Sequence, residues 1–262
     1  MLVALTISAL LVLVIIGLVV VKMSQDSPSN TSTRLPAGAA AVKSVTSIPA
    51  STYNAVGYQP DVTLPSPVKG KPLTRGGKPV MIYLGAEYCP YCAAQRWAIV
   101  AALARFGTFT HLGATHSSSV DVYPSTPTFS FHGSTFTSPY LVLSAVETNS
   151  NKVVNQHYAP LDQPTAEQIK AYNTYNPSNA IPFTDIANRY VQASASYDPA
   201  VLRGLSMTQI ATAVRNPNSA VSKAILGSAN GLTAAICTQT GGKPADVCSS
   251  TAVTSTAPHL GK

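Results

Sequence analysis

The chain opens with an unbroken apolar segment. Between Leu2 and Val21 almost every residue is Ala, Val, Leu or Ile, and none is charged. A helix of this length spans about 30 Å, the thickness of a bilayer core. A cleavable signal peptide has a shorter apolar region, of about 7–15 residues, and a basic start. We therefore expect residues 1–22 to form one retained N-terminal transmembrane helix; a cleaved signal, with small-residue sites near Ala37, is the alternative.

The next segment has a different pattern. Residues 23–70 are rich in Ser, Thr, Pro and Ala and show no strong helical period. Such composition is typical of linkers. We expect a flexible linker that holds a folded domain away from a membrane.

A strand followed by a helix is predicted after the linker. The apolar run at residues 79–84 predicts a buried strand, and residues 85–88 a turn. Apolar residues then recur with a helical period to about Phe106, and Gly107 is a natural helix stop. Pro90 suits the first helical turn, where its missing N–H costs nothing. The strand thus leads through a turn directly into the start of the helix.

Two cysteines lie at this helix start, in the run Cys89-Pro90-Tyr91-Cys92. The thiolate is the reactive form of cysteine, and free N–H groups at a helix start stabilise negative charge. Cys89 is therefore the predicted nucleophile. Cys92 follows one turn later, where it can close a disulfide and resolve a mixed disulfide.

Zinc binding and an inert disulfide are the alternatives for this motif. A structural zinc site needs four ligands, usually in two closely spaced pairs. The other two cysteines, Cys237 and Cys248, are separated by ten residues, so they do not supply a second closely spaced pair. We therefore predict redox chemistry at Cys89 and Cys92, with no metal and no cofactor beyond the disulfide.

The motif resembles that of a known superfamily. Residues 78–92 are similar to the strand, turn and active-site helix of thioredoxin-like proteins: the run ending at Cys89 matches the thioredoxin Ala-Glu-Trp-Cys with Tyr for Trp, and the Pro-Tyr pair is that of glutaredoxins. The longer context resembles the prokaryotic membrane-associated domain of unknown function family 929. The resemblance implies an α/β fold over residues 71–250, with a thioredoxin-like central sheet flanked by helices. It implies no substrate.

Two positions depart from the thioredoxin pattern. Thioredoxins carry a buried Asp in the strand before the motif, which accepts the proton of the second cysteine, whereas this chain has Tyr83 there. A Lys usually follows the second cysteine, and here the residue is Ala93. Deprotonation of Cys92 therefore needs another group or water, which leaves disulfide donation or isomerisation open beside reduction.

The resemblance also implies a cis-proline that faces the cysteines at the start of a later strand. Pro127 and Pro182 are the candidates. The expected order is strand, helix, strand, helix and then the proline strand; Pro182 satisfies it, because a helix-like stretch precedes it. That choice requires an insertion at about 117–160, which contains strand-like segments. The substrate groove is then lined by five residues: Tyr88, Pro90, Tyr91, Ile181 and Pro182.

The C-terminal third predicts helices at about 206–237, followed by a tail at 251–262. Cys237 and Cys248 flank a turn-rich loop. We expect a structural disulfide between them, with an electron relay to the motif and a reduced, inert pair as the alternatives. Two cysteine pairs fit an oxidising compartment.

The charged residues alter the predicted function and location only slightly. Lys and Arg number 17 against 10 Asp and Glu, a net charge of +7, but the basic residues are scattered, so no nucleic-acid partner is expected. Lys22 argues weakly for a cytoplasmic body; the cysteines argue for an extracytoplasmic one and are given more weight. Glu87, two residues before Cys89, is either a proton shuttle or a solvated turn carboxylate.

Together these patterns predict a single-pass cell-membrane protein whose extracytoplasmic domain is a thiol–disulfide oxidoreductase. Its expected partners are proteins that carry thiols or disulfides, and a membrane redox partner. Two other functions stay open: a non-catalytic module that binds a partner in its groove, and a copper-handling protein that uses Cys89 and Cys92 as soft ligands.

Overall fold

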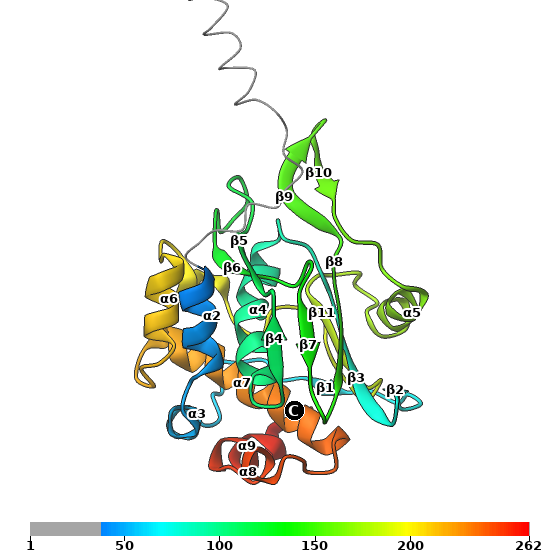
Figure 1. The fold of residues 1–262 in the computed structure, drawn as a ribbon, viewed down its shortest axis with the longest axis vertical. Coiled ribbons are helices and arrows are strands. Elements are labelled where there is room, and N and C mark those ends of the chain that lie inside the picture. Colours follow the sequence, from blue (N-terminus) through cyan, green and yellow to red (C-terminus); the bar gives the residue numbers. More distant parts are fainter. Residues whose placement is uncertain (1–37, 262) are drawn as a thin grey trace, which may run out of the picture. The chain divides into compact units, whose positions relative to one another are not determined.

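A mixed β-sheet lies at the centre of residues 38–261, the part of the chain that the computed structural model describes (Figure 1). Strand β3 (Lys78–Gly85) pairs in parallel with β8 (Val142–Glu147). On its other side β3 pairs antiparallel with β11 (Phe183–Ile186), which pairs antiparallel with β12 (Tyr190–Gln192). The edges are extended by β1 (Ser66–Pro67), beside β12, and β2 (Thr74–Arg75), beside β3.

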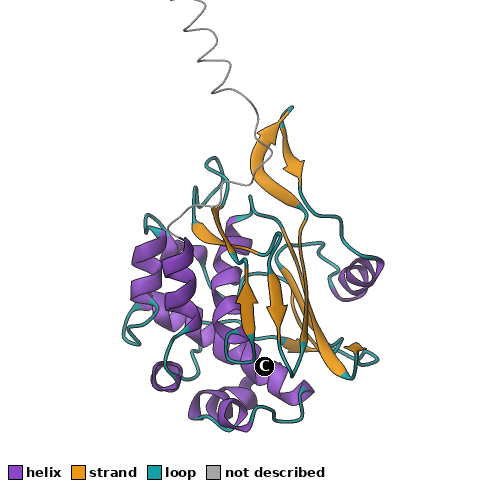
Figure 2. Cartoon of the chain, viewed as in Figure 1, coloured by secondary structure: helices purple, strands orange, loops and turns teal. Residues whose placement is uncertain are grey.

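The sequence of β3 explains its central place. Its residues from Val80 to Gly85 are all buried, as expected for a strand with both faces covered. Met81 and Tyr83 face the larger hydrophobic core, on the side of α4 (Pro90–Leu103). The alternate residues, among them Ile82, face a smaller core beneath α5 (Ala166–Tyr175). Figure 2 shows this division, with α5 alone on one side and the other large helices on the opposite side.

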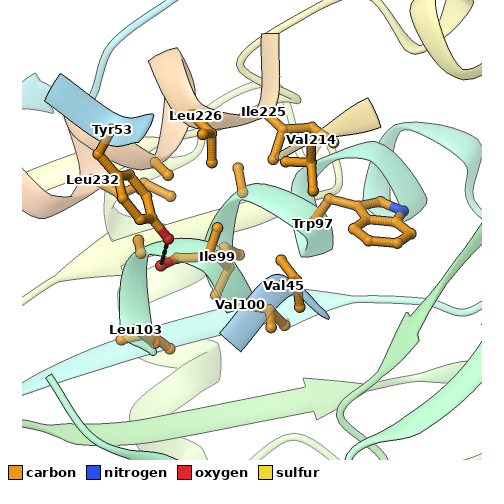
Figure 3. Packing of buried hydrophobic residues seen from close by; sticks show 14 of the residues in the cluster. Val45, Tyr53, Trp97, Ile99, Val100, Leu103, Val214, Ile225, Leu226 and Leu232 are labelled. Carbon is orange, nitrogen blue, oxygen red and sulfur yellow. Dashed lines mark hydrogen bonds between the residues drawn. The ribbon is translucent and has the colours of Figure 1, made fainter. Parts of the chain in front are cut away.

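Helix α4 forms the larger core together with α7 (Ala220–Gln239). Figure 3 shows Ile99 of α4 in one hydrophobic cluster with Leu226 and Leu232 of α7. Among the described residues, α7 is the one helix long and apolar enough to cross a membrane. However, 83% of its most apolar window is buried inside the protein, and a core helix passes the same test.

The predicted linker is wrong from residue 38 onward. Helices α2 (Gly38–Thr46) and α3 (Ala50–Val56) form there, and Val45 and Tyr53 are buried in the larger core. The Tyr53 hydroxyl donates a 2.8 Å hydrogen bond to the carbonyl of Ala101 in α4 (Figure 3). These helices are short and carry small residues on their buried sides, so their period is weak. The predicted anchor, residues 1–22, and the first part of the linker, 23–37, lie outside the described residues.

The first described residue packs closely against a neighbouring strand. A Cβ atom at Gly38 would lie 2.6 Å from the Cβ of Ala114, in β5 (Gly113–His116). Only a glycine therefore lets the start of α2 approach β5 this closely. The start of α2 is therefore held against β5.

The predicted insertion at 117–160 is only partly peripheral. It contains β8, which is a strand of the central sheet, so this stretch is not an addition to the sheet. Most residues of β8 are only half-buried, as in an edge strand, so its central place was not predicted. The remaining strands form three separate two-stranded sheets. They are β4 (Thr108–Thr110) with β7 (Thr135–Thr137), β5 with β6 (Pro127–Ser130), and β9 (Asn149–Val154) with β10 (His157–Pro160).

The predicted C-terminal helices agree with the structure, but the predicted tail does not. Helices α6 (Met207–Ala213) and α7 occupy the expected region. Helix α9 (Thr251–Thr256) lies in the supposed tail, and its Ala252 and Val253 are buried. The side-chain oxygen of Asn54 accepts the Ala252 N–H at 3.0 Å, a cap from a distant helix that no local pattern reveals. The remaining helices are short: α8 (Ala245–Cys248) and the 3-10 turns Pro199–Leu202 and Ala257–His259.

Cys237 and Cys248 form a disulfide, as predicted. The bond joins the last turn of α7 to α8. It closes the turn-rich loop between these helices.

Candidate active site

Cys89 occupies the position that the sequence predicts, at the start of α4. It is the N-cap residue, with an extended backbone, and Pro90 is the first helical residue. The Cys89 sulfur accepts a hydrogen bond from the backbone N–H of Cys92 at 3.2 Å. The sulfur therefore takes the place of the oxygen that usually caps a helix, where negative charge is stabilised.

The two sulfurs differ in access to solvent. Cys89 retains 6% of its possible exposure, and Cys92 retains none. Both are free thiols in this structure. The more accessible residue is thus the one at the helix start, as its predicted role as nucleophile requires.

Pro182 lies beside the cysteine pair, because the residue before it, Ile181, contacts the Cys89 sulfur. The Cys89 sulfur is 3.8 Å from the carbonyl oxygen of Ile181, to which the thiol donates. The Ile181–Pro182 peptide bond is cis, and Pro182 directly precedes β11. Pro127, the other candidate, begins β6, and its carbonyl accepts the indole N–H of Trp97 at 2.9 Å. The choice of Pro182 as the cis-proline is confirmed.

The pKa values of the two thiols are displaced in opposite directions. A hydrogen bond from the Cys92 side chain lowers the pKa of Cys89 most; burial opposes it, and the Cys92 amide and the charge of Arg96 lower it further. Burial raises the pKa of Cys92 well above its ordinary value. The structure therefore provides one thiol that ionises easily and one that stays protonated.

A buried ion pair, which the sequence did not predict, lies behind the cysteines. The Arg96 Nη1 atom is 2.8 Å from Oε2 of Glu147, and both side chains are fully buried. Arg96 follows Cys92 by four residues, so the two share a helix face. Glu147 ends β8, opposite Gly85 of β3. The helical spacing was a usable signal for Arg96, but Glu147 is 51 residues away.

Tyr83 and Glu87 complete this buried cluster. The Tyr83 hydroxyl accepts a 3.2 Å hydrogen bond from Arg96. Burial raises the pKa of Tyr83 well above its ordinary value, so the phenol stays protonated. Glu87 is buried, and its Oε1 atom has no hydrogen-bond partner among the described residues. The prediction of a solvated carboxylate at Glu87 is therefore wrong. The burial of Glu87 does not test its other predicted role, that of a proton shuttle.

Four tyrosines surround the motif. Tyr88 stacks on Tyr158 of β10, with ring centres 4.1 Å apart, and Tyr91 meets Tyr123 edge-on at 5.9 Å. The Tyr158 hydroxyl donates to Ser118 at 2.8 Å. Tyr88 and Tyr91 were predicted to line a groove, whereas Tyr123 and Tyr158 come from distant segments and could not be predicted.

The described residues contain no group of three or more His, Cys, Asp or Glu side chains placed to hold a metal ion. Within that part of the chain, no third His, Cys, Asp or Glu side chain joins Cys89 and Cys92 to form such a group.

Comparison with known proteins identifies a family. A family model described as Domain of unknown function (DUF929) matches residues 65–238, a range that includes the central sheet, both motif cysteines and most of α7. No curated protein and no solved structure matches the chain. The match covers well over half of the sequence, so the chain belongs to the DUF929 family.

Proposed function

We propose that this protein is a thiol–disulfide oxidoreductase with a thioredoxin-like fold. The observation that carries the proposal is the placement of the Cys89 sulfur as the cap of α4, bonded to the Cys92 amide. The element order supports the fold: β3, α4, β8, α5 and then β11, directly preceded by cis-Pro182. This is the order expected of a thioredoxin-like domain.

In the proposed reaction, the Cys89 thiolate attacks one sulfur of a substrate disulfide. A mixed disulfide forms and the other substrate sulfur leaves as a thiolate. Cys92 then loses its proton and attacks the Cys89 sulfur, which releases the second substrate thiol and leaves a Cys89–Cys92 disulfide. The same steps in reverse donate a disulfide to a dithiol, and the direction depends on the partner's reduction potential.

The groove for the substrate is formed by the predicted residues together with their tyrosine neighbours. Ile181 lies against the attacking sulfur, and Tyr91, 39% exposed, lies within the motif. Exposed apolar side chains lie on nearby segments: Val120 and Val122 precede Tyr123, and Val153 and Val154 end β9. An aromatic and aliphatic rim around the nucleophile suits a polypeptide substrate.

We propose that the domain works outside the cytoplasm, attached to the cell membrane through residues 1–22. The Cys237–Cys248 disulfide supports an oxidising compartment, where such bonds persist. Partners would be proteins with thiols or disulfides and a membrane redox protein that resets the Cys89–Cys92 pair.

The test uses the full chain with Cys89→Ser and Cys92→Ser variants and a disulfide-bonded model protein. We expect Cys89→Ser to abolish exchange and Cys92→Ser to accumulate a mixed disulfide through Cys89, detected by mass spectrometry. The Cys237→Ser/Cys248→Ser variant is the matched control and should exchange like the wild type. Equal exchange by wild type and Cys89→Ser would refute the enzyme and favour the binding module.

A further inference from the structure

One buried cation faces several acidic groups behind the cysteine pair. The Arg96 Nη1 atom donates to Glu147 at 2.8 Å and to the Ala86 carbonyl at 3.2 Å. That same carbonyl accepts the backbone N–H of Cys89 at 3.3 Å. The guanidinium is thus joined to both the Glu147 carboxylate and the backbone of the nucleophile. Burial lowers the pKa of Arg96, but the charges of Glu147 and the other acidic groups around it together outweigh burial, so the pKa is raised and the guanidinium remains charged.

The number of negative charges near Arg96 changes with the state of the cysteines. In the disulfide form neither sulfur is charged, so no cysteine anion acts on the ion pair of Arg96 and Glu147. In the reduced form the Cys89 thiolate adds a second anion within the range of the same guanidinium. An uncompensated charge in a buried site is costly and is usually removed by protonation. One of the two anions should therefore take up a proton.

We propose that reduction of the Cys89–Cys92 disulfide is coupled to protonation of the Glu147 carboxylate. The proposal rests on the proposed function and adds a proton-linked step to it. A dithiol reductant supplies two electrons and two protons and becomes a disulfide. The Cys89–Cys92 bond breaks, Cys92 receives one proton, Glu147 receives the other, and Cys89 is left as a thiolate stabilised by the charge of Arg96. Atoms and charge balance, because a carboxylate anion is replaced by a thiolate anion.

The other groups around Glu147 are less suited to take this proton. Tyr83 is already a protonated phenol bonded to Arg96. The Asp162 carboxylate accepts the Glu147 backbone N–H at 3.4 Å, but it is about one-third exposed and is bonded to His132 at 2.7 Å. Glu87 is buried and its charge acts on Glu147, yet it makes no ion pair with Arg96. Burial raises the pKa of Glu147 to about 7, against the effect of Arg96, so a nearby thiolate acts on a group already close to titration.

Infrared difference spectroscopy of the full chain tests this step directly. The protein is oxidised, the Cys89–Cys92 disulfide is verified by thiol counting, and dithiothreitol is added at pH 7. We expect a carbonyl-stretch band of a protonated carboxyl group to appear on reduction. The band should be absent in Glu147→Gln and retained in Glu87→Gln, which replaces the other buried carboxylate beside the motif. The Cys89→Ser/Cys92→Ser variant reports any signal from reduction of Cys237–Cys248.

The pH dependence of the reduction potential gives a second measurement, independent of the infrared band. A tenfold change in proton concentration shifts a two-electron couple by about 30 mV for each proton taken up. We expect about 59 mV per pH unit near neutral pH for the wild type, and about 30 mV for Glu147→Gln.

The outcomes separate the two proposals. A wild-type protein that forms the disulfide and exchanges, but shows no carboxyl band and a one-proton slope, overturns the role of Glu147 alone. A band that persists in Glu147→Gln assigns the proton to another group and also overturns it. If thiol counting shows that no Cys89–Cys92 disulfide forms, the oxidoreductase and the coupled proton both fall.

Discussion

At the scale of single residues, Cys92 acts on Cys89 through two groups, its thiol and its backbone amide. The amide belongs to the backbone at the start of α4, so it remains in place when the Cys92 side chain is replaced by Ala or Ser. The thiol hydrogen bond does not, and it contributes most to the low pKa of Cys89. In the proposed reaction, the resolving cysteine would therefore also activate the nucleophile.

Replacing Cys92 should raise the pKa of Cys89 to a degree that depends on the new side chain. Cys92→Ala removes the donor, whereas Cys92→Ser keeps a hydroxyl in its place. The thiolate of Cys89 exists above its pKa, so we expect Cys92→Ala to move the midpoint of iodoacetamide alkylation to higher pH than Cys92→Ser does. At pH 7 the alanine variant should react more slowly. Identical midpoints would show that the thiol hydrogen bond has no effect.

The sequence reveals the cysteines but not their surroundings. Cys89 and Cys92 are evident because a strand, a turn and Pro90 fix the start of a helix locally. The helical spacing places Arg96 on the face of Cys92 but does not reveal its burial: on most helices a guanidinium would be exposed, and here it is buried because Glu147 of β8 neutralises it. A buried charge is stable only with its partner, and the partner is known only once the sheet is assembled.

At the scale of elements, β3 and α4 were predictable, whereas α2, α3 and the place of β8 in the central sheet were not. The first two carry a continuous apolar run and a clear cap. Helices α2 and α3 consist largely of Ala, Ser, Thr and Val and are stabilised by contacts with α4 and α7, so tertiary packing decides their structure. Strand β8 has half-buried residues and gained its place through its parallel pairing with β3.

Tyr53 measures how much α3 contributes to the fold. Tyr53→Phe removes the hydrogen bond to Ala101 and should lower the free energy of unfolding by about 1 kcal/mol. Tyr53→Ala also removes the buried ring, and we expect a loss of about 3–5 kcal/mol. Tyr91→Phe, at a partly exposed position, is the control and should change stability by less than about 0.5 kcal/mol. Urea unfolding of the full chain measures all three. If Tyr53→Ala were as stable as the control, α3 would contribute nothing to the fold and would be better described as a linker.

At the scale of the whole molecule, the Cys237–Cys248 disulfide connects α7 to the C-terminal helices that complete the larger core. The double variant Cys237→Ser/Cys248→Ser should lower the free energy of unfolding by about 3 kcal/mol, the chain-entropy value for a loop of this size. Thiol–disulfide exchange at Cys89 should stay unchanged at temperatures where the variant is folded. Lost exchange with unchanged stability would instead identify the pair as an electron relay.

The close contact between Gly38 and Ala114 sets how far this domain could range from an attachment point. With residues 23–70 as free chain, an anchor at 1–22 would permit a reach of about 160 Å. Because the chain is already part of the folded unit at residue 38, at most fifteen residues, 23–37, separate the two, and their fully extended length is about 50 Å. A protein anchored in this way would meet only those clients that pass within one domain's width of the lipid, or that share its membrane.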